Sequence, residues 1–286
     1  MIKKATPLLL FLALLPAALL VWWPLWFLLA GSLTAQSELL STIGPALGAG
    51  GSGATWQFLP NQPTLANLIE LLLDTPQFFV MFWNTAGQVF PQVAGQLLAG
   101  APAAWALSRL RFRGRGAVRV LYIVLMLLPF QVTMVPSYLV LSRLSLLDTP
   151  WAVILPGVFA TFPVFIMMRG FDAVPRPLLE AAAIDGAGQL QTFFHIGLPL
   201  GLPGILAALT LNFLDGWNAI EQPMTFLKNQ ALWPLSLYLS SVNIQKLGVA
   251  MAASLAMLLP AALIFRFGQP YLELGLAEIG GGAVKE

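Results

Sequence analysis

Residues 169–203 read RGFDAVPRPLLEAAAIDGAGQLQTFFHIGLPLGLP, a stretch in which prolines and glycines bound two short helical segments. Pro177 suits the first turn of a helix, because its ring presets φ and its missing N–H is not needed there. Leu178–Ala187 is rich in helix-forming residues, and Gly186 and Gly188 are expected to end this helix. A second short helix over Leu190–Ile196 leads to Pro199. The stretch therefore predicts a compact helix-turn-helix.

The chain around this stretch has the composition of a membrane protein. Of its 286 residues, 58% are hydrophobic and only 9% are charged, against roughly 25% charged in soluble domains. This excludes a soluble enzyme, a nucleic-acid binder and a disordered chain. There is no cysteine and only one histidine, His195, so thiolate metal sites, disulfides and paired-histidine motifs are excluded as well.

Six stretches are long and apolar enough to cross a bilayer. Most of them contain proline, which membrane helices tolerate, so kinked helices are expected. The predicted spans are Pro7–Ala30, Asn84–Leu107, Val120–Leu141, Trp151–Met168, Leu198–Ala219 and Leu247–Phe267.

Lysine and arginine specify the orientation, because they concentrate on the cytoplasmic side. With both termini in the cytoplasm, only Arg143, Lys228 and Lys246 of the 14 cations lie outside. The predicted organisation is then an N-terminus and first helix (1–30), an extracytoplasmic loop (31–77), a five-helix transmembrane region (78–268) with a cytoplasmic loop (169–199), and a cytoplasmic tail (269–286).

Two features resemble nucleotide or catalytic sites. Residues 48–53 read GAGGSG, with Glu70 at the distance of a ribose-binding acid. They lie in an outer loop without the strand and helix that a dinucleotide site needs, so we interpret them as a loop. No P-loop motif is present, so the chain is not expected to hydrolyse ATP. We interpret His195 as a packing or interface residue, and we predict no catalytic residue and no metal site.

The arginines of RLRFRGR, residues 109–115, directly follow the second span. They fit a topology anchor, and they also fit a contact with anionic lipid or with a partner.

Polar residues also occur inside the spans, where they must face protein or water. Three glutamines four residues apart form one stripe on the second span, and three polar residues share one face near the end of the fifth. Either set could contact a polar solute or bond to other helices. The residues are Gln88, Gln92 and Gln96, and Asn212, Asp215 and Asn218.

The 169–203 stretch also resembles the EAA loop of the membrane subunits of ABC-type importers. That loop reads Glu-Ala-Ala, three residues, Gly, nine residues, Ile, one residue, Leu-Pro. All seven fixed positions are present at this spacing: Glu180, Ala181, Ala182, Gly186, Ile196, Leu198 and Pro199. RLRFRGR, WNAIEQPMTFL, WPLSLYL and the ending GGGAVKE are similar to carbohydrate permeases, in particular the second permease of maltose-type transporters.

The resemblance implies an all-α integral membrane fold, the six-helix transmembrane bundle of an ABC type I importer permease with a cytoplasmic coupling helix. It implies a prokaryotic inner-membrane location and a complex with a second, non-identical permease, two ATPase subunits and an extracytoplasmic solute-binding protein that delivers a sugar. ATP and Mg would bind the ATPase subunits, and this chain would hold no cofactor. The EAA residues with Asp185 would couple to the ATPase, and Gly281, Gly282, Val284 and Lys285 of the tail would contact it.

The sequence leaves three alternative functions to consider. The cargo could be another polar solute, such as glycerol phosphate. A secondary transporter or channel would show inverted repeats and intramembrane charges, but no repeat is seen and Asp215 is the one candidate charge. An intramembrane enzyme needs convergent catalytic groups, and the sequence offers none.

Overall fold

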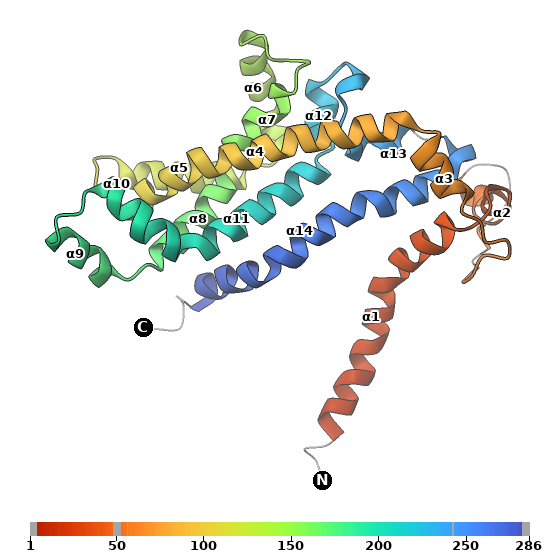
Figure 1. Cartoon of the computed structure of the whole chain (residues 1–286), viewed down its shortest axis with the longest axis horizontal. Coiled ribbons are helices and arrows are strands. Elements are labelled where there is room, and N and C mark those ends of the chain that lie inside the picture. Colours follow the sequence, from red (N-terminus) through yellow and green to blue (C-terminus); the bar gives the residue numbers. More distant parts are fainter. Residues whose placement is uncertain (1–4, 48–52, 56, 242, 282–286) are drawn as a thin grey trace. The chain divides into compact units, whose positions relative to one another are not determined.

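The computed structural model describes residues 5–47, 53–55, 57–241 and 243–281, and these residues are helices and their connections. The one strand-like pairing among them is an isolated antiparallel bridge between Thr34 and Pro63. The expectation of an all-α chain is confirmed. The chain forms two compact units, Met1–Val80 with Tyr238–Leu259, and Met81–Leu237 with Pro260–Glu286 (Figure 1).

The first unit contains most of the segment between the first two spans. It comprises α1 (Ala5–Ser32), α2 (Gln36–Thr42), α3 (Ala66–Leu73), the start of α4 (Pro76–Arg109), α13 (Tyr238–Ser241) and the first part of α14 (Leu247–Gly281). Asn67 donates from Nδ2 to the carbonyls of Ser32 at 3.0 Å and Thr34 at 2.8 Å. Lys246 pairs with Glu70 at 2.6 Å. The predicted outer loop thus contains short helices joined by specific polar contacts.

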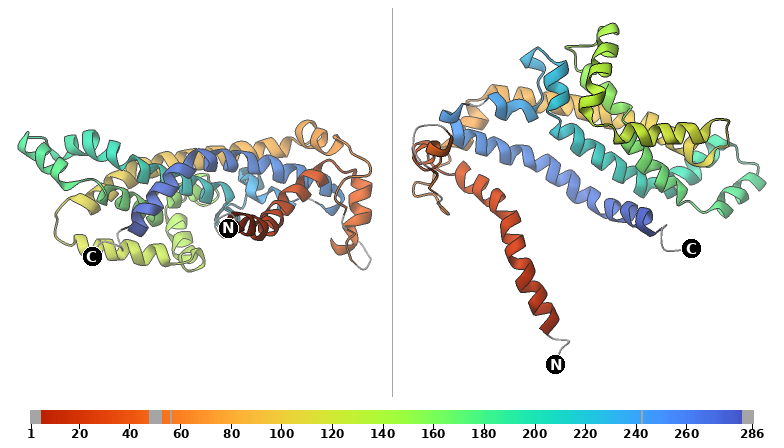
Figure 2. Two further views of the ribbon diagram at one scale, coloured as in Figure 1. Left: turned by 90° about the horizontal axis from the view of Figure 1, so that it is seen from below. Right: turned by 180° about the vertical axis from the view of Figure 1, so that it is seen from behind.

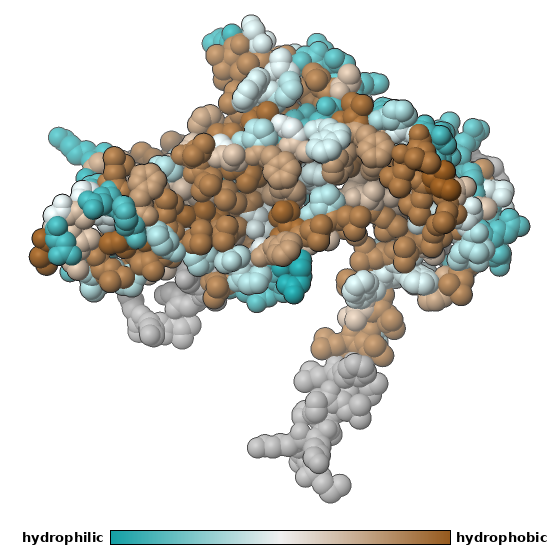
Figure 3. Space-filling model, viewed as in Figure 1, coloured by the Kyte–Doolittle hydropathy of each residue, from teal (hydrophilic) through white to brown (hydrophobic). Residues whose placement is uncertain are grey.

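The second unit contains the other long helices, and α8 runs alongside α11 in it (Figures 1 and 2). Gly170 and Gly204 allow this close approach, because small residues let membrane helices bring their backbones together. In the space-filling view, apolar side chains cover much of the visible surface of the long helices (Figure 3). The helices are α5 (Arg115–Leu127), α6 (Phe130–Arg143), α7 (Trp151–Val158), α8 (Thr161–Asp172), α9 (Arg176–Ile184), α10 (Gln189–Thr192), α11 (Leu198–Asn218) and α12 (Glu221–Phe226), with parts of α4 and α14.

Four helical stretches in the described part of the chain are long and apolar enough to span a membrane, and a fifth qualifies if one bent pair of helices counts as a single span. The four are Leu14–Ser32, Trp151–Asp172, Gln189–Asn218 and Ile244–Leu274. The predicted second span lies in α4, which has 34 residues but is not among these candidates.

The third predicted span, Val120–Leu141, is bent much more sharply than a kinked helix. It consists of α5 and α6, which meet at an angle of 108°. Leu128 between them is extended, with φ −74° and ψ 124°. The cause is Pro129, because a proline disfavours the helical region for the residue before it.

Two further boundaries differ from the prediction. The fourth span, Trp151–Met168, is divided into α7 and α8 where Ala160 leaves the helical region. The sixth continues well beyond Phe267, since α14 extends to Gly281 with Pro260 and Pro270 inside it. Residues 269–281 of the predicted tail are therefore helical.

Candidate functional site

The EAA segment, residues 176–199, begins with α9, which ends in a turn closed by hydrogen bonds. The N–H of Gly186 donates to the carbonyl of Ala183 at 3.2 Å, and the N–H of Ala187 donates to that of Ala182 at 2.9 Å. These two bonds are the pair that defines a Schellman motif, which satisfies the last carbonyls of a helix. The turn therefore closes on itself through backbone bonds within the chain.

Gly186 has the left-handed conformation that this motif requires, with φ +80°. A glycine directly after a helical run favours this conformation. No atom of the described chain lies within 4 Å of a β-carbon built at this position. Backbone conformation, and not crowding within this chain, therefore explains why glycine stands here.

Most side chains of the EAA segment face outward. Glu180, Ala181 and Asp185 are exposed, as is Pro199, whereas Ala182 is buried and Ile196 and Leu198 are half-buried. Ile184 is 87% exposed. An apolar surface of this kind on short helices is typical of a protein contact. The exposed large apolar residues of the segment are Leu178, Ile184, Leu190 and Phe194.

An aromatic cluster attaches this segment to the long helices. Phe193 lies in a π-turn, Phe193–Gly197, that joins α10 to α11 without a break. Its ring centroid lies 5.7 Å from that of Trp105 on α4 and 6.1 Å from that of Phe171 on α8. A β-carbon on Gly197 would lie 2.7 Å from the Trp105 ring. The EAA segment is therefore packed against α4 and α8 and is continuous with α11.

Sequence reasoning missed this cluster, because its aromatic residues come from three separate segments. The spacing of Gly197, Gly201 and Gly204 was the available signal, since small residues at such intervals mark faces where membrane helices approach closely.

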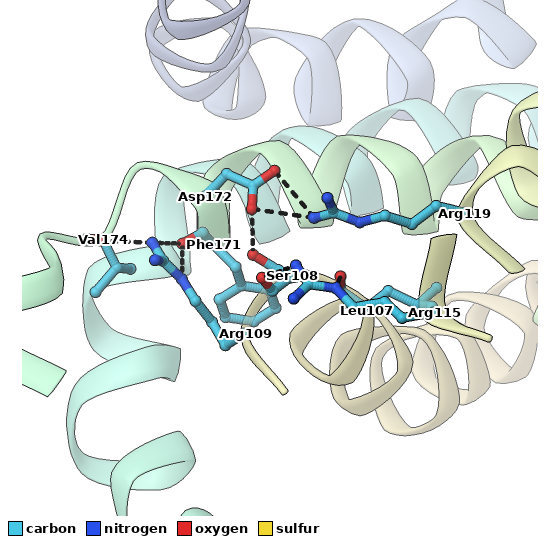
Figure 4. Close-up of polar contacts among 8 residues, drawn as sticks. All are labelled: Leu107, Ser108, Arg109, Arg115, Arg119, Phe171, Asp172 and Val174. Atoms are coloured by element: carbon cyan, nitrogen blue, oxygen red, sulfur yellow. Dashed lines mark hydrogen bonds and ion pairs between the residues drawn. The ribbon is translucent and has the colours of Figure 1, made fainter. Parts of the chain in front are cut away.

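Arginines of the 109–115 cluster bind the ends of two helices (Figure 4). Arg109 donates from Nε to the carbonyl of Phe171 at 2.8 Å and from Nη2 to that of Val174. Arg115 donates from Nε to the carbonyl of Leu107 at 2.7 Å. Arginine in these positions satisfies free carbonyls at the C-terminal ends of helices, where the dipole favours positive charge.

Asp172 connects two of these elements. It accepts a hydrogen bond from Ser108 at 2.6 Å and pairs with Arg119 at 3.2 Å (Figure 4). In contrast, Arg111 and Arg113 are exposed, with no polar partner among the described residues. The cluster thus combines a structural set of arginines with two that face outward.

The glutamine stripe lies in the packed interior of the second unit. Gln88 donates to the carbonyl of Leu232 at 2.9 Å, and Gln92 donates to Oδ1 of Asn212 at 2.9 Å. Gln96 is 0% exposed, and its amide, oriented to satisfy its neighbours, donates to the carbonyls of Gly157 and Val158 at 3.0 and 2.8 Å. The three side chains therefore bond helix to helix.

The polar residues of α11 line a hollow of about 700 Å³. It lies where α5 ends and α8 begins, and Met126, Leu128 and Phe162 form part of its apolar wall. The polar lining consists of Asn212, Asp215 and Asn218. The structure thus brings together these three predicted residues and separates them from the glutamines, apart from the Gln92–Asn212 bond.

The other features singled out in the sequence, His195, the GAGGSG stretch and the C-terminal tail, form no binding site among the described residues. His195 is exposed and contacts the carbonyl of Gln191 through Nδ1 at 3.0 Å. No cluster of potential metal ligands occurs among the described residues. Most of GAGGSG, and Gly282, Val284 and Lys285 of the tail, lie outside the described residues, while Gly281 is the last residue of α14.

Residues 96–277, which hold the EAA segment, the aromatic cluster and the hollow, match the family described as "Binding-protein-dependent transport system inner membrane component". The chain belongs to this family. The family match covers most of the second unit and confirms that the chain is a transport permease component of an inner membrane.

Individual family members and a solved structure are similar over nearly the whole permease. The arabinooligosaccharides transport system permease protein AraQ of Halalkalibacterium halodurans is 28% identical over 285 residues, 98% of each chain. A putative ABC transporter permease protein of Caldicellulosiruptor sp. is 31% identical over 267 residues, 92% of this chain and 91% of that protein. A bacterial ABC transporter involved in the import of the acidic polysaccharide alginate shares the fold, with a TM-score of 0.75 and 23% identity over 94% of this chain and 97% of that one.

Proposed function

We propose that the chain is the membrane permease subunit of an ATP-driven importer that takes up a sugar delivered by a solute-binding protein. The observation that carries the proposal is the structure of the EAA segment. It presents exposed apolar side chains on a short helix closed by a Schellman motif. Such a surface fits a cleft in an ATPase subunit.

The coupling residues would be Glu180, Ala181, Ala182, Asp185, Gly186, Ile196, Leu198 and Pro199. Closure of the ATPase subunits would push α9, and the contact of Phe193 with Trp105 and Phe171 would pass that movement to the long helices. Interfaces and packed cores convert small local shifts into such rigid-body movements.

In this proposal α4 and the bent pair α5–α6 each count as one span, which gives six spans with both termini in the cytoplasm. The buried bonds of Gln88, Gln92 and Gln96 support α4 as a span, because polar side chains inside a membrane are stable when bonded to other helices. The cation distribution supports the orientation.

The partners would be a second, non-identical permease, two ATPase subunits that bind ATP and Mg, and an extracytoplasmic solute-binding protein. The sugar assignment is supported by the relatives, whose names include transport of arabinooligosaccharides and of polygalacturonan or rhamnogalacturonan in Bacillus subtilis. Glycerol phosphate is the alternative cargo.

The test is uptake into vesicles that contain the assembled importer. The proposal predicts sugar accumulation that requires ATP inside the vesicle and binding protein outside. Uptake that follows a proton gradient without ATP would contradict it and support a secondary transporter. ATP-dependent uptake of glycerol phosphate in preference to every sugar would overturn the carbohydrate assignment alone.

A further inference from the structure

The hollow beside α11 is lined in part by Asn212, whose side chain has a hydrogen-bond donor without a partner among the described residues. Asn212 is only 3% exposed, and its Oδ1 accepts a hydrogen bond from Gln92. That bond fixes the amide, and Nδ2 then has no partner among the described residues. A buried donor without an acceptor costs about 1–3 kcal/mol, so this group calls for an explanation.

Acceptors lie beside this donor on the same helix face. Asp215 is one turn further along α11, lines the same hollow, and has no ion pair or hydrogen bond among the described residues. Asn218 follows after another turn, and its Nδ2 donates to the carbonyl of Leu214 at 2.8 Å. Its Oδ1 therefore remains as a second acceptor.

We propose that this hollow binds the hydroxyl groups of a neutral carbohydrate, so that this chain itself contacts the transported sugar. A hydroxyl both donates and accepts, and it can satisfy the free Asn212 donor and the Asp215 carboxylate together. The carboxylate of a uronate, like a phosphate, only accepts hydrogen bonds, and its negative charge would face that of Asp215. This inference rests on the proposed function and narrows its substrate to uncharged sugars.

The rest of the hollow suits a sugar ring. Phe162 is 48% exposed and offers an aromatic face against which the C–H groups of a sugar can pack. A volume of about 700 Å³ lies within the range of small-molecule sites, which combine apolar walls with a few placed polar groups. An unpaired carboxylate within a span is itself characteristic of a solute pathway.

The experiment uses the whole importer in vesicles and exploits the lack of native cysteine. Ala219→Cys places a thiol at the edge of the hollow, and Ser142→Cys on α6 is an exposed control outside it. Uptake of maltotriose, xylotriose and arabinotriose is measured first. The maleimide labelling rate of each thiol is then compared with and without the transported trisaccharide, and with trigalacturonate.

The neutral trisaccharide should slow labelling at position 219 and leave that at 142 unchanged, and trigalacturonate should affect neither. Asp215→Asn should raise the concentration needed for protection about tenfold, because a hydrogen bond to a charged group is lost. Glu221→Gln is the matched control and should leave protection unchanged.

The outcomes separate the two proposals. If no trisaccharide is taken up with ATP, the proposed function fails and this inference falls with it. If one is taken up but gives no protection, if trigalacturonate protects equally, or if Asp215→Asn has no effect on protection, this inference alone is overturned.

Discussion

Gly170 and Gly204 bring the backbones of α8 and α11 into direct contact, since a β-carbon added at Gly204 would lie 2.7 Å from the Cα atom of Gly170. The neighbouring atoms are backbone, so a side chain at either position can fit only if a helix moves. This contact lies next to the aromatic cluster that holds the EAA segment.

Gly204→Ala should destabilise the protein by roughly 1–3 kcal/mol, because overpacking forces the two helices apart. Gly87→Ala is the matched control, since Gly87 also lies inside a helix but has open space around it. Thermal unfolding of both variants in detergent is the measurement. Equal midpoints for the two variants would contradict the direct contact.

Gly186→Val should weaken binding of the ATPase subunit while the membrane helices still fold. Valine at φ +80° would cost about 1–3 kcal/mol of backbone strain. Gly186→Asn should be tolerated better, because asparagine enters this conformation more readily. ATPase co-purification and sugar uptake check this, with Gly188→Ala at an ordinary φ of −69° as control. Full ATPase association and normal uptake for Gly186→Val would refute the coupling role.

Arg109→Lys should lower stability by roughly 1–2 kcal/mol. Lysine lacks the planar fork with which Arg109 reaches the carbonyls of both Phe171 and Val174. Arg111→Lys, at an exposed position with no polar partner in the described chain, should leave the unfolding midpoint unchanged. A similar loss in both variants would show that the cost comes from the substitution itself and not from the helix-end bonds.

Cysteine labelling in intact cells tests the orientation. Ser41→Cys, in the segment between the first two spans, should react with an impermeant maleimide added outside, and Ala173→Cys after α8 should react only once the cells are opened. The asymmetric distribution of lysine and arginine is the reason. Reaction of position 41 only from the cytoplasm would invert the topology.

Deletion of residues 280–286 should lower the ATPase activity of the assembled importer. The resemblance to maltose-type permeases suggests that this end reaches the ATPase interface. ATP hydrolysis with loaded binding protein is the readout, and a substitution of Lys285 by Ala separates the charge from the length. Unchanged hydrolysis and transport would mark the end as dispensable.

The sequence predicted features that depend on local chemistry. The turn at Gly186 and its positive φ follow from a glycine placed just after a short helical run. The helical spans were found from runs of apolar residues, although the 108° bend after Leu128 was expected only as a kink, because a proline sets where a helix breaks and packing sets the angle.

Contacts between distant segments could not be predicted in this way. Trp105, Phe171 and Phe193 share no local pattern, and the bond from Gln92 to Asn212 joins residues 120 positions apart. The sequence placed polar residues on two helix faces, but only the structure separates the glutamines that bond helices together from the side chains that line the hollow.

The turn after α9 is held by backbone bonds of this chain alone, and this has a consequence for the speed of assembly. Ordering a flexible residue on binding would cost about 1–2 kcal/mol of backbone entropy. In the proposed complex the ATPase subunit would avoid that loss, because the turn is already closed before binding. Association should then be limited by encounter and orientation rather than by folding, and the subunit should be able to dissociate and rebind without the permease refolding.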